Sequence, residues 1–179
     1  MASPLIVPIA PTALRSHEKS QPTSKESVAA ILKRSKTSLI ADWLTRTKKT
    51  PELNHLHLSD DQRTGHLPRL VEDLVKRLSI PKLPDKDSDA NPSPAAVQHG
   101  LLRRKQGYSS GMLIHESRIL QVTIFGVLHQ NLGLLEFSLL LPDVMVIADE
   151  VDSQLTQTME SFSNGAPKSA KAQLVKPKG

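Results

Sequence analysis

The sequence contains no cysteine. This absence excludes structural disulfides, thiolate catalysis and cysteine-ligated zinc or iron–sulfur centres. It is typical of proteins that work in a reducing compartment, so we predict a cytoplasmic location. Aromatic residues make up only 3% of the chain, so any core must consist mainly of Leu, Ile, Val and Ala.

Long apolar runs and the familiar catalytic motifs are also missing. No continuous apolar stretch is long enough to span a bilayer, which predicts that the chain does not insert into membranes. The sequence has no nucleophile elbow, no P-loop and no dinucleotide-binding fingerprint. These absences favour a non-catalytic protein.

The net positive charge of +5 comes from the two ends of the chain. Basic residues outnumber acidic ones before Glu26, and the segment after Phe162 carries lysines and no acid. The stretch between them is close to neutral, whereas nucleic-acid-binding domains carry a basic patch. We therefore predict no nucleic-acid partner.

At 179 residues the chain has room for one domain with tails. Residues 1–21 contain several prolines and then turn polar, which predicts a disordered N-terminal arm. We expect residues 22–163 to form a helical domain and residues 164–179 to form a basic, disordered tail. Residues 80–92, rich in Pro, Asp and Lys, predict a flexible loop inside the domain.

Apolar residues recur at helical spacing along most of the central stretch. In front of the first such segment, Thr23 and Glu26 form a capping box, which predicts one helix running to about Lys48. Trp43, the only tryptophan, lies on the apolar stripe of this helix and is expected to anchor the core.

Two further segments carry helix-start or helix-break signals. Ser59 and Gln62 form a second capping box, and Pro68 should kink or restart the helix that follows. The apolar run 134–147 is divided by Pro142, which predicts either a kinked helix or a turn followed by a helix. Together the patterns predict an all-α fold, a single bundle of four to five helices.

Residues 97–130 form the stretch around which this bundle is organised, a predicted helical hairpin. Gly107 supplies the left-handed residue that ends a helix without a Cβ penalty. Ser109 is placed to cap the next helix, and Tyr108 and Leu113 occupy the positions of a hydrophobic staple. So short a turn predicts that the two helices are antiparallel neighbours.

Three polar residues of this hairpin are expected to meet. His99 and Arg103 are four residues apart and share one helix face. Folding at Gly107 brings that face level with Glu116 on the second helix. The sequence therefore predicts an internal network of His99, Arg103 and Glu116 that sets the register, with a fully solvated trio as the alternative.

The residues of the hairpin resemble a known family. They are His99-Gly100-Leu101-Leu102-Arg103, Gly107-Tyr108, Leu113, Glu116 and Leu120. This pattern is similar to the N-terminal domain of RsbRD-type stressosome co-antagonists (RsbT co-antagonists), which also heads some bacterial histidine kinases as a sensory domain. Two positions depart from it, with Ser117 in place of an aromatic residue and Gln121 in place of arginine.

The resemblance implies an all-helical sensory or regulatory module, for which a globin-like arrangement without haem is a variant. Its motif residues would be His99, Gly100, Arg103, Gly107, Tyr108 and Glu116. We therefore expect a bacterial signalling or stress-response module that acts through dimerisation or through a protein partner. The apolar surplus at 134–147 fits an interface or an internal core equally well.

An alternative function is histidine phosphotransfer. His115-Glu116-Ser117-Arg118 resembles the start of the phosphoacceptor box of sensor kinases, in which an exposed histidine is the nucleophile and the glutamate its base. The proline that follows in such boxes is missing here, and the chain has no room for an ATP-binding domain.

Metal and cofactor binding have weaker support in the sequence. His55, His57 and His66 are close together, but their spacing matches no metal motif, so we predict no metal site. Haem ligation by His99 is a third possibility. Because Arg103 lies on the same helix face, a salt-bridged structural histidine is favoured instead, and we predict no cofactor.

Overall fold

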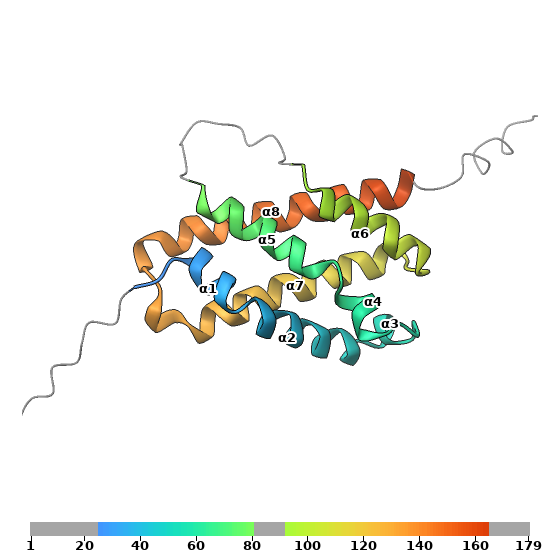
Figure 1. Cartoon of the computed structure of the whole chain (residues 1–179), viewed down its shortest axis with the longest axis horizontal. Helices are drawn as coiled ribbons and strands as arrows, with labels where there is room; N and C mark the ends of the chain where they lie inside the picture. Colours follow the sequence, from blue (N-terminus) through green and yellow to red (C-terminus); the bar gives the residue numbers. More distant parts are fainter. Residues whose placement is uncertain (1–24, 81–91, 165–179) are drawn as a thin grey trace, which may run out of the picture.

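The computed structural model describes residues 25–80 and 92–164, and its regular elements within them are helices (Figure 1). In chain order they are α1 (Val28–Arg34), α2 (Lys36–Lys49), α3 (Pro51–Asn54), α4 (Asp60–Thr64), α5 (Leu67–Ser79), α6 (Pro94–Lys105), α7 (Ser110–Gln130), the 3-10 helix η1 (Leu132–Leu134) and α8 (Phe137–Asn164). The predicted all-α bundle is thus confirmed.

The number of long helices also agrees with the prediction. Helices α2, α5, α6, α7 and α8 each contain at least 12 residues, whereas α1, α3 and α4 are short. The predicted N-terminal arm and nearly all of the predicted internal loop and C-terminal tail lie outside the described residues. Asn164, which we assigned to the tail, is the last residue of α8.

The start of the domain differs from the prediction. Helix α1 begins at Val28, and its cap is Ser27, whose hydroxyl accepts a hydrogen bond from the Ala30 N–H. Glu26 instead forms an isolated parallel bridge with Leu135, which ties the chain before α1 to the chain before α8. The single predicted helix is divided at Ser35, which separates α1 from α2.

The later start signals are confirmed. Ser59 and Gln62 form the predicted capping box at α4, and α5 restarts with Pro68 in its first turn. Pro142 lies inside α8, so the apolar run from Phe137 onward belongs to one helix that is not interrupted at the proline, and only residues 134–136 precede it. These signals are local, because a capping residue needs only backbone N–H groups two or three positions away.

The main hydrophobic core draws on α1, α2, α5, α6, α7 and α8, and Trp43 is 1% exposed within it. Helix α8 packs most extensively against α6, and α7 packs against α2 and α8 (Figure 1). Within the described ranges, no helix combines the length and apolar character needed to cross a membrane.

The predicted hairpin is correct at its turn, but its two helices are not extensively packed neighbours. The contact between α6 and α7 is far smaller than the contact between α6 and α8. Gly100 accounts for the close contact with α8, because a Cβ added there would lie 2.2 Å from the Thr158 carbonyl oxygen of α8. The missing side chain lets the α8 backbone take the place beside α6.

Candidate functional site

The turn between α6 and α7 has the geometry that its sequence predicts. Gly107 has φ 82°, the left-handed value that glycine adopts without strain. The Ser109 side chain accepts a hydrogen bond from the Met112 N–H and caps α7. Tyr108 is 5% exposed and packs with Leu113 and Leu53 in a second apolar cluster. The turn therefore reverses the direction of the chain and brings the start of α7 near the end of α6.

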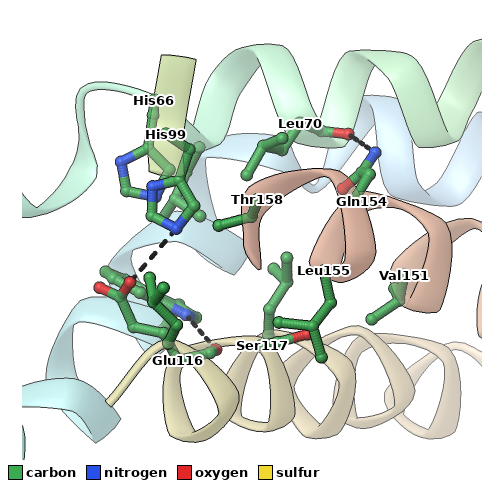
Figure 2. Close-up of a pocket in the computed structure, with 13 residues that line it drawn as sticks. His66, Leu70, His99, Glu116, Ser117, Val151, Gln154, Leu155 and Thr158 are labelled. Carbon is green, nitrogen blue, oxygen red and sulfur yellow. Dashed lines mark hydrogen bonds and ion pairs between the residues drawn. The ribbon is translucent and has the colours of Figure 1, made fainter. Parts of the chain in front are cut away.

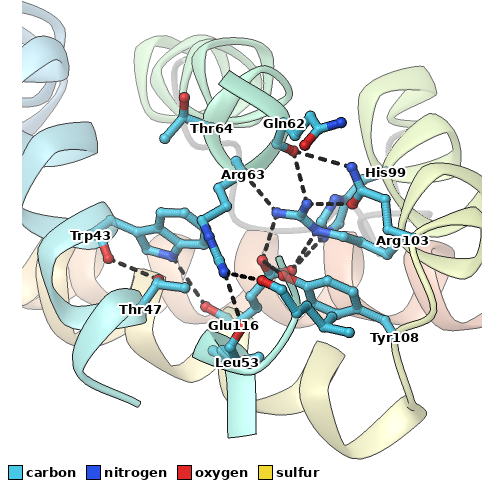
Figure 3. Close-up of polar contacts among 12 residues, drawn as sticks. Trp43, Thr47, Leu53, Gln62, Arg63, Thr64, His99, Arg103, Tyr108 and Glu116 are labelled. Carbon is cyan, nitrogen blue, oxygen red and sulfur yellow. Dashed lines mark hydrogen bonds and ion pairs between the residues drawn. The ribbon is translucent and has the colours of Figure 1, made fainter. Parts of the chain in front are cut away.

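Arg103 of α6 and Glu116 of α7 meet just inside this turn (Figure 3). The arginine Nε donates to Glu116 Oε2 at 3.0 Å and its Nη2 donates to Oε1 at 2.6 Å. Their side chains are 0% and 3% exposed. Such a two-pronged contact is both strong and directional. The predicted internal ion pair is confirmed, and the alternative of a solvated trio is excluded.

Arg103 also reaches backbone groups that the sequence did not indicate. It donates from Nη1 to the Gln62 carbonyl at 3.0 Å and to Gln106 Oε1 at 2.7 Å, and from Nη2 to the Arg63 carbonyl at 2.7 Å. One guanidinium thus connects α4, α6 and α7 (Figure 3). Backbone carbonyls carry no residue-specific signal, so no sequence pattern could have revealed Gln62 and Arg63 as partners.

A second buried arginine supports the same region. Arg63 is 2% exposed and donates to the carbonyls of Leu53 at 3.0 Å and Leu56 at 2.6 Å. These bonds hold the loop between α3 and α4 against the bundle. The carbonyls that Arg103 needs are therefore presented by a segment that is itself fixed.

Tyr108 and His99 complete the coordination of the carboxylate. The tyrosine hydroxyl donates to Glu116 Oε1 at 2.9 Å, and its ring lies 4.7 Å from the Arg103 guanidinium carbon. His99 Nε2 is 3.3 Å from Glu116 Oε2. All three predicted network residues are therefore in contact, and Tyr108 joins them through a hydroxyl that the staple pattern did not predict.

His66 is the residue that sequence reasoning missed. Its ring stacks on that of His99, with centroids 3.9 Å apart and an interplanar angle of 17° (Figure 2). His66 is buried, whereas His55 and His57, its neighbours in sequence, are exposed. We call His66, His99, Arg103, Tyr108 and Glu116 the buried polar cluster.

Burial and charge set the protonation states of this cluster. Burial lowers the pKa of both His66 and His99, and the positive Arg103 lowers them further, although Glu116 acts in the opposite direction on His99. Burial alone would raise the pKa of Glu116, but His99 and Arg103 together outweigh it and the pKa falls. The cluster therefore holds a charged pair, Arg103 and Glu116, beside two neutral imidazoles.

Gly100 of the resemblance has a clear packing role beside the cluster. A Cβ there would lie 2.1 Å from Ser161 Oγ as well as 2.2 Å from the Thr158 carbonyl. In the same contact, Thr158 Oγ1 donates to the Ala96 carbonyl of α6 at 3.1 Å. The small residues of α6 thus allow α8 to approach at backbone distance.

The proposed phosphoacceptor pair is divided between surface and interior. His115 is exposed and lines a surface pocket of about 240 Å³ with Arg46 and Arg118. Glu116 faces the opposite way and has both carboxylate oxygens occupied. The glutamate is therefore not available as a base for His115.

The motif residues of the RsbRD resemblance all lie at or beside one structural feature. Gly107 makes the turn, Gly100 admits α8, and His99, Arg103 and Glu116 form the charged contact. Comparison of the chain with protein-family models, with curated proteins and with solved structures finds no match. The RsbRD-type assignment and its globin-like variant therefore stay predictions that rest on the hairpin residues.

Proposed function

We propose that this chain is a non-catalytic bacterial signalling or stress-response module that works in the cytoplasm through homodimerisation. One observation supports the sensory-module part of the proposal. Three residues of the RsbRD-type resemblance, His99, Arg103 and Glu116, meet in one buried contact, next to the turn at Gly107 and the close approach at Gly100.

The interface part of the proposal rests on α8. Phe137, Leu141 and Met145 are 68%, 70% and 66% exposed, and their four-residue spacing places them along one side of the helix. We call these three residues the α8 stripe. Single exposed apolar residues are ordinary on protein surfaces, but a contiguous row of large ones marks an interaction site.

Charge favours a second copy of the chain as the occupant of the stripe. Residues 137–142 carry no charge, whereas the rest of α8 carries five acidic side chains and no lysine or arginine. Two α8 helices that cross antiparallel at Leu141 bring their uncharged first turns together and direct the longer acidic parts away from each other. A two-fold axis through the stripe makes this contact self-complementary.

The change Leu141→Lys tests this interface, because it places a charge at the centre of the contact. We expect the wild-type chain to be a dimer by light scattering and the variant to be a monomer. Ile114→Lys is the matched control, since Ile114 is 50% exposed on α7 and lies outside the stripe. A monomeric wild type, or a Leu141→Lys variant that remains dimeric, would contradict the proposed interface.

The signalling role is tested in the native host. We expect deletion of the gene to alter a stress response and the Leu141→Lys allele to reproduce that defect, whereas the Ile114→Lys allele behaves as wild type. If deletion leaves stress responses unchanged, the signalling role is wrong even where the dimer is found.

Histidine phosphotransfer remains the second candidate, because exposed His115 lies in one pocket with two arginines. Arg46 and Arg118 would stabilise the charge of a phosphorylated imidazole. Since Glu116 is committed to Arg103, the phosphoryl group would have to come from a separate kinase that supplies its own base. The test is phosphate incorporation from such a kinase, lost in His115→Gln and retained in His129→Gln.

A further inference from the structure

We propose that His66, His99 and Glu116 form a binding site for one divalent transition-metal ion of the class that favours imidazole ligands, such as Zn²⁺ or Co²⁺. Each residue offers one ligand atom, and these atoms all lie within 4.8 Å of one another. The three side chains come from the turn before α5, from α6 and from α7, and they converge (Figure 2). This inference does not depend on the proposed signalling function.

Unpartnered imidazole nitrogens are the first support. Both His66 Nδ1 and His99 Nδ1 are buried and have no hydrogen-bond partner among the described residues. The two residues are only 9% and 7% exposed. Buried polar atoms are almost always paired, so two such atoms on adjacent rings require an explanation. An imidazole that is neutral and lacks a protein partner is also the form that binds metal ions.

The space beside the imidazoles is the second support. A cavity of about 30 Å³ is lined by His66, His99 and Glu116, by Ser117, Gln154 and Thr158, and otherwise by apolar side chains. This volume suits one ion with a bound water, and two imidazoles with one carboxylate form a donor set that leaves a position open for water. Because the two rings are nearly parallel, one of them must turn to share an ion, and the cavity provides that room.

A pocket on the surface side of the histidine pair is the third support. The two imidazoles line a second pocket of about 140 Å³, whose other walls include the exposed residues Gly65, Arg69 and Gln98. The histidine pair therefore lies between this outer pocket and the inner cavity. An ion would approach the ligands from this outer pocket, past the histidine pair.

Arg103 limits the metal affinity that we expect of the site. Its positive charge is 2.6 Å from Glu116 Oε1 and opposes the arrival of a cation. Glu116 Oε2 accepts the Arg103 Nε bond and also lies 3.3 Å from His99 Nε2, so an ion shared by His99 and Glu116 would replace this second contact. We expect binding weaker than that of closed structural zinc sites, and selective for ions that prefer nitrogen.

The experiment uses Trp43 as an internal reporter. Its ring centroid lies 6.2 Å from that of His66, and the chain has no other tryptophan. Co²⁺ bound in the site should therefore quench the tryptophan fluorescence. We expect quenching that saturates at one Co²⁺ per chain and is reversed by Zn²⁺. Wild-type chain that shows no saturable quenching would overturn the proposal.

Variants locate the ion. His66→Gln and His99→Gln should each weaken the apparent Co²⁺ affinity at least tenfold. His115→Gln is the matched control, because His115 is exposed on α7, and it should bind as wild type. The His66 side chain makes no hydrogen bond among the described residues, so its variant is the one best suited to remain folded, and circular dichroism checks this. If folded His66→Gln gives the same midpoint as wild type in the Co²⁺ titration, the proposal is also overturned.

Discussion

The buried polar cluster and the α8 stripe reverse the usual distribution of side chains. In the cluster, Arg103 and Glu116 are 0% and 3% exposed, although both carry charge. In the stripe, Phe137 and Leu141 are 68% and 70% exposed, although both are apolar. Buried charges are tolerated only when they are paired, and exposed apolar rows are retained mainly where something binds them.

The two regions therefore differ in where their partners lie. Every charged group of the cluster finds its partner within the chain, so the cluster determines how α4, α6 and α7 fit together. The stripe has no such internal partner in the described structure. The comparison indicates that one region specifies the fold, whereas the other is free to serve an interface.

The largest effect is expected for Arg103→Ala. Removal of the guanidinium leaves Glu116 buried with its charge unpaired, so we expect a loss of about 3–5 kcal/mol in the free energy of unfolding. Urea denaturation measures it. Lys105→Ala, an exposed change on the same helix, should stay within about 0.5 kcal/mol of wild type. Equal midpoints for the two variants would show that the cluster does not determine the fold.

Gly100→Ala should have the second largest effect. We expect a loss of about 1–3 kcal/mol in the free energy of unfolding, because the added methyl group forces α6 and α8 apart. Gly111→Ala is its matched control on α7. A Cβ at Gly111 would meet nothing closer than Ser109 Oγ at 3.8 Å. This change should therefore raise the free energy of unfolding by about 0.5–1 kcal/mol, because alanine favours the helix more than glycine does. Thermal unfolding of both variants gives the sign of each effect, and a neutral Gly100→Ala would contradict the close approach.

Glu150→Gln tests buried charge on α8, away from the cluster. Burial raises the pKa of Glu150; Asp73 and Asp149 raise it further, while the hydrogen bond from Gln154 and the charge of Arg77 lower it. The folded-state pKa therefore lies above the unfolded value. Ionisation of Glu150 therefore lowers the free energy of unfolding at pH values above the unfolded-state pKa. Below about pH 4 the side chain is neutral in both states, and the effect disappears.

We accordingly expect Glu150→Gln to melt at a higher temperature than wild type at pH 7. The two melting temperatures should converge as the pH is lowered toward about 4, where both side chains are neutral. A variant that melts lower than wild type at pH 7 would show that the carboxylate is stabilised as an ion in the fold.

The smallest effect on the chain's own stability is expected for Leu141→Lys. Because the side chain is already 70% exposed, the free energy of unfolding should change by no more than about 0.5 kcal/mol. The measurement is made at a concentration at which wild type and variant are both monomeric, so that association does not contribute. A large loss would place Leu141 in the internal core and remove the contrast between the two regions.

The candidate site was predicted only in part. His99, Arg103 and Glu116 were identified from their spacing about Gly107, because a helical face and a short turn together place them within reach. His66 was considered only with His55 and His57, its neighbours in the sequence. No local pattern shows that the turn before α5 places His66 against His99 of α6.

The packing of the hairpin was the main error. The short turn correctly predicted a reversal of direction, but it did not predict which helix lies beside α6. That outcome depends on Gly100, whose missing side chain admits the α8 backbone. A glycine within a helix does not by itself show which partner approaches it.

The sequence alone determined the local features of this protein: the caps at Ser59 and Ser109, the left-handed turn at Gly107 and the helical class. Each depends on interactions between residues a few positions apart, so its signal is contained in a short segment. The tertiary structure alone decided the carbonyl partners of Arg103, the stacked histidines and the exposure of the α8 stripe. These features depend on which distant segments pack together. No local sequence pattern identifies the backbone carbonyls that a side chain will reach or the apolar residues that packing will leave exposed.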